Sequence, residues 1–192
     1  MTDALLIIDM QQGSFGPLTP RHDSAALIGR LNRLAGTVRE TGGVVIFIQH
    51  DGPPGDPHHP DQPGWQPLDD LDVQPNDAIV HKRSCDAFLE TSLAEFLAAR
   101  SIDRLIVTGC ATDYCVDTTV RSALARGYPT IVPSDGHTTS DRPHLAAVKI
   151  IEHHNAIWVD FLAPRGPALV CPCSEVPVIH QIAALRVRHQ HA

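Results

Sequence analysis

Short apolar runs alternate with amphipathic segments along most of the chain. The first run, residues 4–8, is rich in branched side chains and stops at Asp9, which is the pattern of a buried parallel strand that emerges at a cleft. Similar runs predict further strands at residues 44–49, 78–82, 104–108, 128–132 and 156–159. Apolar positions at helical spacing predict intervening helices at residues 22–41, 92–100, 113–126 and 142–154.

The order of these elements predicts an α/β fold. Because strands and helices alternate, we expect a mostly parallel sheet with helices on both faces, joined by right-handed crossovers. Residues 51–75, rich in Pro, Gly and Asp, form a long loop, and such loops in compact domains are usually functional. The pattern fades after Pro164, apart from a weakly helical stretch at 179–187. We therefore predict one domain over residues 1–164 and a C-terminal tail of unknown role over residues 165–192.

Composition narrows the class of protein. With 192 residues, 43% of them hydrophobic and 19% charged, the chain is suited to one soluble domain. A net charge of −7 without a basic run argues against nucleic acid as a partner. The start of the chain lacks a signal peptide and no apolar run reaches spanning length, so no membrane is expected. Five irregularly spaced cysteines indicate reduced thiols and a cytoplasmic location.

Three reactive residues fall at predicted strand ends. Asp9 ends the first strand, Lys82 ends the third, and Cys115 follows the fourth at the start of a helix. Ligands of open α/β sheets bind beyond the carboxyl ends of the strands, so these side chains are candidates for one site. A helix N-terminus and Lys82 would both favour the Cys115 thiolate. Asp9 could take the thiol proton while Lys82 keeps that carboxylate ionised and aimed.

Each of these residues also has a structural explanation when taken alone. A single cysteine is more often a small buried hydrophobe than a nucleophile, and Asp9 could simply cap the turn that follows its strand. Lys82 alone would usually be a solvated surface charge. Their shared placement at strand ends is what favours catalysis.

Three motifs resemble the isochorismatase-like cysteine hydrolases over roughly residues 4–160. They are residues 6–11 (LIIDMQ), 82–88 (KRSCDAF) and 108–116 (TGCATDYCV), in that order and spacing. The resemblance implies a three-layer α-β-α Rossmann-like sandwich with a six-stranded parallel sheet, and a catalytic triad of Asp9, Lys82 and Cys115. It also implies a cis bond between Cys110 and Ala111, with the backbone N–H groups of Ala111 and Cys115 forming an oxyanion hole.

The resemblance further implies a nucleophilic mechanism. Family members that act as isochorismatases cleave a vinyl ether and lack a cysteine at the position of Cys115, whereas amidase-type members have one. We therefore expect a cysteine hydrolase that cleaves an amide-type C–N bond of a small molecule through a thioester, without a cofactor. Family members commonly assemble, so a homo-oligomer is expected.

The long loop contains residues that could bind a metal or contact the substrate. Nicotinamidases of the family hold a metal with an Asp-x-His pattern after the second strand, but here the sequence is Asp51-Gly52-Pro53, so no metal is expected. A site made by Asp51 with His58 or His59 is kept as an alternative. From their positions, Phe15, Trp65 and Tyr114 are candidates for an apolar wall around the substrate, although each could equally belong to the core or to a subunit interface.

Other functions stay open at this point. The chain could be an isochorismatase-type or nicotinamidase-type hydrolase. It could also be a non-hydrolytic thiol redox protein in which Cys110 or Cys85 resolves an oxidised Cys115. A scaffold that has lost catalysis is a third alternative, against which the intact triad argues.

Overall fold

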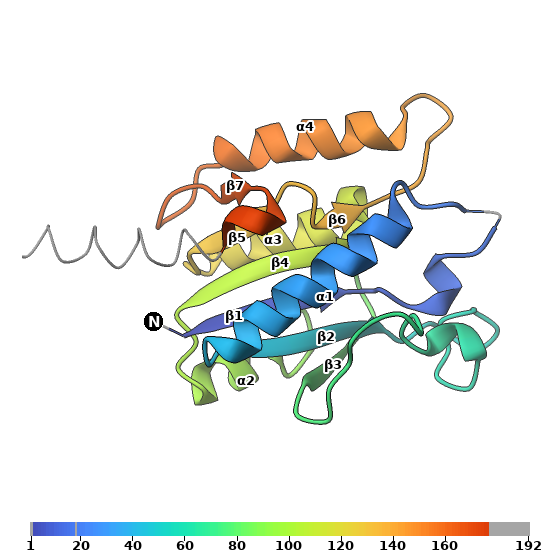
Figure 1. Ribbon diagram of the computed structural model, residues 1–192, viewed down its shortest axis with the longest axis horizontal. Coiled ribbons are helices and arrows are strands. Elements are labelled where there is room, and N and C mark those ends of the chain that lie inside the picture. The colour runs from blue at the N-terminus through green and yellow to red at the C-terminus, as the bar shows by residue number, and fades with distance from the viewer. Residues whose placement is uncertain (1, 18, 177–192) are drawn as a thin grey trace, which may run out of the picture.

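A single parallel sheet runs through the computed structural model, which describes residues 2–17 and 19–176 (Figure 1). Its strands lie in the order β3 (Ala78–Lys82), β2 (Val44–His50), β1 (Asp3–Ile8), β4 (Arg104–Cys110), β5 (Thr130–Pro133) and β7 (Leu169–Cys171). The short strand β6 (His137–Thr138) pairs with the end of β4. Every pairing between these strands is parallel. The predicted α/β fold and six-stranded sheet are thus confirmed, with β6 as a short addition.

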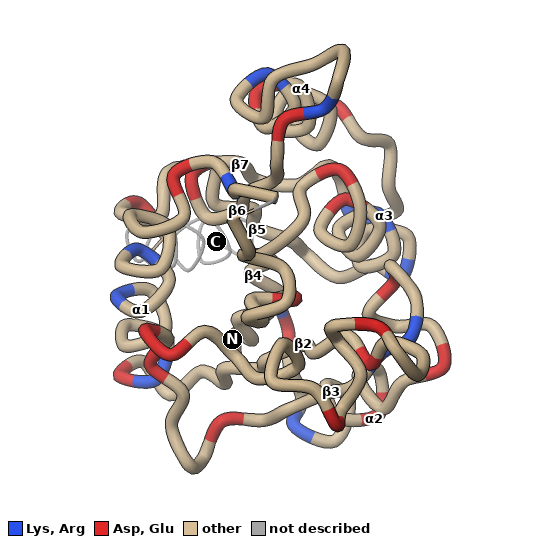
Figure 2. The backbone as a smooth tube through the Cα atoms, turned by 90° about the vertical axis from the view of Figure 1, so that its right-hand side faces the viewer, with Lys and Arg blue, Asp and Glu red and all other residues tan. Residues whose placement is uncertain are grey.

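Helices cover both faces of this sheet (Figure 2). Helix α1 (Ser24–Glu40) packs on one face, and α2 (Leu93–Ala99) and α3 (Asp117–Ala125) on the other. Helix α4 (Ala147–Val159) contacts β7 at the edge of the sheet. The predicted three-layer sandwich is confirmed. None of the helices in the described part of the chain has both the length and the apolar character that crossing a bilayer requires.

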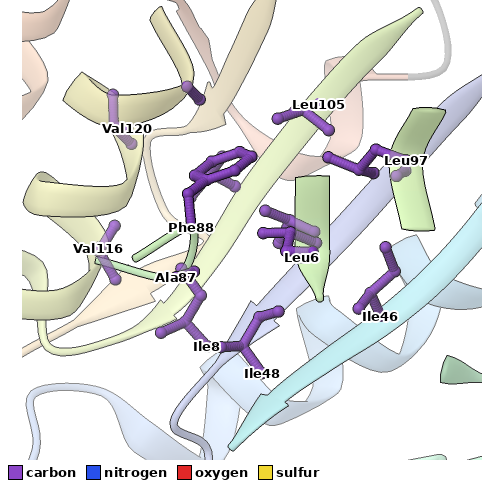
Figure 3. Packing of buried hydrophobic residues seen from close by; sticks show 14 of the residues in the cluster. Leu6, Ile8, Ile46, Ile48, Ala87, Phe88, Leu97, Leu105, Val116 and Val120 are labelled. Carbon is purple, nitrogen blue, oxygen red and sulfur yellow. The ribbon is translucent and has the colours of Figure 1, made fainter. Parts of the chain in front are cut away.

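The alternation of side chains along β1 builds two cores. Leu5 and Ile7 belong to the cluster on the α1 side, and Leu6 and Ile8 to the cluster on the opposite side. Figure 3 shows the second cluster, in which Leu6 and Ile8 meet side chains from β2 and from the segment around Phe88. Because successive residues of a strand point to opposite faces, a strand buried on both faces reads as one continuous apolar run.

The prediction of a strand at residues 156–159 is wrong. These residues form the last turn of α4, where the buried Trp158 packs edge-on against His137 and its Nε1 donates to Asp117 (2.8 Å). A short apolar run alone does not distinguish a buried strand from a buried helix. The edge strand is instead β7, so the sheet extends past residue 164 into the segment that we expected to be a tail. The weakly helical stretch at 179–187 lies outside the described residues.

Gly109 allows β4 to lie close to β1 near the carboxyl edge of the sheet. Its φ is +115°, and a Cβ at this position would lie 2.2 Å from the carbonyl oxygen of Ile8. Only glycine combines this backbone conformation with so close an approach. The approach keeps the ends of β1 and β4 together, and both candidate residues Asp9 and Cys115 follow these ends.

We predict that Gly109→Ala lowers the free energy of unfolding by about 3 kcal/mol or more, because the new Cβ collides with backbone that cannot move aside. Gly36→Ala is the matched control. Gly36 lies within α1 and nothing approaches its Cβ position within 4 Å, so this change should stabilise the protein by up to about 1 kcal/mol. Urea denaturation measures both values, and equal effects at the two glycines would contradict the argument.

Candidate active site

The three predicted catalytic residues meet at the carboxyl edge of the sheet. Asp9 directly follows β1, Lys82 is the last residue of β3, and Cys115 lies in a π-helical turn (Thr112–Val116) between β4 and α3. The Lys82 ammonium donates to Asp9 Oδ2 (2.7 Å), to the Ser84 carbonyl (3.0 Å) and to Cys115 Sγ (3.3 Å). One cation therefore joins all three strand ends.

Lys82 is buried, and its partners compensate for the loss of water. Its exposed fraction is 1% and that of Asp9 is 6%. A buried charge is tolerated only when it is paired and hydrogen-bonded, and the three partners match the three N–H groups of the ammonium. Burial lowers the pKa of Lys82, but the negative charge of Asp9 and the hydrogen bonds to Asp9 and Cys115 outweigh it, so this pKa lies above its ordinary value. Lys82 is a permanent cation in the site.

Cys115 differs from the expectation that it is a ready thiolate. Burial is the largest influence and the negative charge of Asp9 the next, and together they raise the pKa of the Cys115 thiol well above its ordinary value although Lys82 opposes them. The thiolate that we expected is therefore not favoured in the resting site, because desolvation and the neighbouring carboxylate outweigh the lysine. The other oxygen of this carboxylate, Asp9 Oδ1, is buried without a hydrogen-bond partner among the described residues.

The backbone around Cys115 agrees with the arrangement implied by the resemblance. The Cys110–Ala111 peptide bond is cis. The Ala111 carbonyl accepts the N–H groups of Tyr114 and Val116, both at 3.1 Å. These bonds turn the backbone beside the nucleophile, at the place where the resemblance implies an oxyanion hole.

A cavity of about 340 Å³ opens over these groups. Its volume suits a small molecule. Four of its lining residues were predicted from the sequence as site residues: Asp9, Ala111, Tyr114 and Cys115. The remaining lining residues are Ser14, Arg21, His50, His58, Arg83, Ser84, Cys85 and Cys110.

Of the three predicted substrate contacts, only Tyr114 reaches the cavity. Tyr114 is 53% exposed, and the Arg142 guanidinium lies 5.0 Å from its ring centroid. Phe15 packs against the core on the α1 side and does not line the cavity. Trp65 also lies off the cavity wall, because its Nε1 donates to Asp51 (2.8 Å) and its ring stacks on His81. Position along the sequence was therefore insufficient to identify the residues of the cavity wall.

The long loop is tied to the sheet by Gln11, which the sequence analysis did not single out as a site residue. Gln11 is buried, its Nε2 donates to the carbonyls of His50 (3.1 Å) and Trp65 (2.9 Å), and its Oε1 accepts the His50 N–H (2.8 Å). These bonds bring the loop beside the first strand end and carry His58 to the cavity. A loop without apolar periodicity gives no signal for such placements, although a buried glutamine two residues after Asp9 could have drawn notice.

Comparison with known proteins identifies the family of this chain. A model of the isochorismatase domain matches residues 3–160. The chain belongs to the isochorismatase family. It is 32% identical over 140 residues to streptothricin hydrolase of Streptomyces noursei, covering 73% of this chain and 51% of that protein. It is 28% identical over 165 residues to maleamate amidohydrolase of Pseudomonas putida, covering 74% and 76%.

Solved structures of the isochorismatase family share the fold. The crystal structure of one isochorismatase family protein superposes with a TM-score of 0.79 at 32% identity, covering 88% of this chain and 96% of that one. Among the curated relatives, the chain spans only about half the length of the streptothricin hydrolases it matches. The similarity therefore concerns the isochorismatase domain.

The metal site of the family's nicotinamidases does not fit the residues present here. Asp51 Oδ1 accepts from Trp65 and lies 3.2 Å from His81 Nδ1, while both ring nitrogens of His58 are hydrogen-bonded, to Asp56 and to Ser14. In residues 2–17 and 19–176, no three His, Cys, Asp or Glu side chains converge as metal ligands would. We therefore derive no catalytic step through a metal.

We predict that Asp9→Asn moves the midpoint of Cys115 alkylation to lower pH, by about one to two units, because the variant removes a negative charge that opposes the thiolate. Iodoacetamide labelling of the Cys115 peptide across pH, followed by mass spectrometry, measures this midpoint. Asp51→Asn is the control, since that carboxylate is held by Trp65. An unchanged midpoint in Asp9→Asn would show that Asp9 does not govern the thiol.

Proposed function

We propose that this chain is a hydrolase that cleaves an amide-type C–N bond of a small molecule, with Cys115 as nucleophile, Asp9 as general base and Lys82 as their common partner. The observation that carries the proposal is the Lys82 ammonium, 2.7 Å from Asp9 and 3.3 Å from Cys115, beneath a small cavity. Nucleophile, base and orienting group within such reach are the geometric requirements of covalent catalysis.

The raised pKa of Cys115 determines how the nucleophile forms. A protonated thiol beside an ionised Asp9 can pass its proton to the carboxylate as the sulfur attacks the substrate carbonyl, without any change in the net charge of the site. Asp9 Oδ1, which has no partner in the described part of the chain, is free for that proton. The amide carbonyl oxygen becomes an oxyanion, for which the N–H groups of Ala111 and Cys115 are the proposed donors.

The same carboxyl group completes the reaction. Asp9 gives its proton to the leaving nitrogen as the C–N bond breaks, which leaves a thioester on Cys115 and an ionised carboxylate. Asp9 then removes a proton from a water molecule that attacks the thioester, and the released thiol regains its proton from Asp9. No external cofactor is needed to balance these steps.

Amide chemistry is favoured by the nucleophile and by the relatives. A cysteine at this position distinguishes the amidase-type members of the family from those that cleave a vinyl ether. Among similar proteins, one is named streptothricin hydrolase and another maleamate amidohydrolase. A homo-oligomer remains part of the proposal on the basis of the resemblance, and light scattering after size-exclusion chromatography tests it.

A thiol redox function is less well supported. Cys110 lines the same cavity, but burial is the main reason that its pKa is raised to about 12, so it would be a poor thiolate for resolving an oxidised Cys115. Oxidation of a thiol also makes no use of the Lys82–Asp9 pair.

Two arginines suggest the charge of the substrate. Arg21 and Arg83 both line the cavity, and neither has an acidic partner among the described residues. Arg21 Nε is bound to the Ser14 carbonyl (2.8 Å), which leaves its terminal nitrogens for a ligand. Because guanidinium groups bind carboxylates with paired hydrogen bonds, we propose a substrate that carries a negative group beside its amide.

We predict that Cys115→Ala and Cys115→Ser lose at least about a thousandfold in kcat for amide hydrolysis, because the nucleophile is gone or too weakly acidic. Ammonia release from maleamate, ureidoacrylate, N-carbamoylglycine and nicotinamide measures the activity of the wild-type protein and its variants. Asp9→Asn should be as inactive while its Cys115 still reacts with peroxide. Turnover retained in Cys115→Ala would exclude the thioester.

We predict that Arg83→Met raises KM for maleamate and ureidoacrylate by about tenfold, the loss of one charge-assisted hydrogen bond, and leaves KM for neutral nicotinamide unchanged. Arg33→Met is the matched control, because Arg33 is an exposed arginine on α1. Steady-state kinetics on the active compounds gives the comparison. An equal rise for anionic and neutral amides would count against a substrate carboxylate at this wall.

A further inference from the structure

Three side chains outside the triad form a hydrogen-bonded chain that ends at the cavity. Asp56 Oδ1 lies 2.9 Å from His58 Nδ1, and His58 Nε2 lies 2.9 Å from Ser14 Oγ. Ser14 and His58 both line the cavity beside Cys115, and Ser14 is 8% exposed. The mechanism proposed above uses none of these three residues.

The chain is held rigidly by close backbone packing. A Cβ at Gly52 would lie 2.7 Å from Asp56 Oδ1, one at Gly64 would lie 2.5 Å from a backbone oxygen of the same loop, and one at Gly13 would lie 3.2 Å from His58 Nε2. The His58 backbone N–H also donates to Asp56 Oδ1 (2.7 Å). The loop can approach Ser14 this closely only because three glycines lack side chains, so the imidazole has little freedom to turn.

The carboxylate fixes where the protons of this chain lie. Hydrogen bonds from the His58 backbone N–H and from its ring hold the pKa of Asp56 below its ordinary value, so Asp56 is ionised and can only accept. The N–H of a neutral His58 ring is then on Nδ1, and Nε2 is an acceptor. Ser14 must give its only proton to Nε2, and the hydroxyl oxygen has nothing left to offer the cavity except lone pairs.

Two further residues that line the cavity each have a polar atom without a partner. Asp9 Oδ1 and His50 Nδ1 are buried without hydrogen-bond partners among the described residues. The His50 ring lies beside that of His58, with 5.9 Å between the centroids. Buried polar atoms are rarely left unpaired, so this wall is suited to a ligand with hydrogen-bonding groups of its own.

We propose that Ser14, held by His58 and Asp56, is a hydrogen-bond acceptor that receives an N–H group of the substrate. The site then selects primary carboxamides and carbamoyl groups over esters with the same acyl part, because an ester offers no N–H to the serine oxygen. Ser14 is thus a specificity-determining residue, and His58 and Asp56 are positioning residues. This inference rests on the proposed function and names the substrate class of that site.

The tautomer of His58 tests the proposal without any turnover. Long-range ¹H–¹⁵N correlation spectra of histidine-labelled protein at about pH 8.5, above the ordinary titration range of imidazole, distinguish the two neutral tautomers. The His58 signal is assigned from its loss in His58→Phe. We expect the proton on Nδ1 in the wild-type protein. A proton on Nε2 would make Ser14 a donor towards the cavity and overturn the proposal.

Kinetics test the selectivity. For Ser14→Ala we expect kcat/KM to fall about tenfold for maleamate and by less than about twofold for monomethyl maleate, which has the same acyl group but no N–H. Ser14→Thr keeps the hydroxyl and should preserve the ratio of the two rates. His58→Phe should shift the ratio as Ser14→Ala does, whereas His59→Phe in the same loop should leave it unchanged.

The outcomes separate this inference from the proposed function. An equal loss for amide and ester in Ser14→Ala would overturn the acceptor role while leaving the hydrolase intact. If the wild-type protein hydrolyses neither compound, the fault lies with the proposed function for this acyl group. The tautomer of His58 then decides alone whether Ser14 is an acceptor.

Discussion

The buried ion pair between Lys82 and Asp9 is the constraint on which the arrangement of the site depends. Removing one partner of such a pair leaves an uncompensated buried charge, which costs about 3–5 kcal/mol in proteins. Lys82 therefore ties the ends of β1 and β3 together, and its third bond fixes the turn that bears Cys115. The ammonium stabilises the fold at the same place where it organises the chemistry.

This pair also explains why the thiol stays protonated without being inert. Asp9 repels a second negative charge, so thiolate and carboxylate beside one lysine are less stable than thiol and carboxylate. A thiolate and a protonated Asp9 carry the same total charge as the resting pair. Proton transfer from the thiol to Asp9 therefore keeps one negative charge beside Lys82. A substrate carbonyl that accepts the sulfur can drive this exchange, and reactivity is then linked to the presence of substrate.

Much of the fold could be predicted from the sequence because strand interiors buried on both faces leave continuous apolar runs. The same logic located Asp9 and Lys82, since parallel strands bring their carboxyl ends to one edge. It failed at residues 156–159, where Trp158 makes an apolar run part of a helix, and it placed Trp65 on the cavity wall although Asp51 holds its indole away. These errors share a cause, because each depends on a tertiary partner that periodicity does not reveal.

The contact between Ser14 and His58 was beyond prediction for a related physical reason. Ser14 and His58 meet because backbone passes close to backbone at glycines in two distant segments, and close packing of this kind leaves no pattern in hydrophobicity. This difference between the strand-end residues and the loop residues has a functional consequence. The charges at the strand ends must be matched within a rigid sheet, which restricts the chemistry to one arrangement. The loop between β2 and β3 is joined to the segment after β1 by an isolated bridge of Gln11 with Pro67. Away from that bridge, its glycines and polar side chains can vary the hydrogen-bonding character of the wall without disturbing Asp9, Lys82 or Cys115.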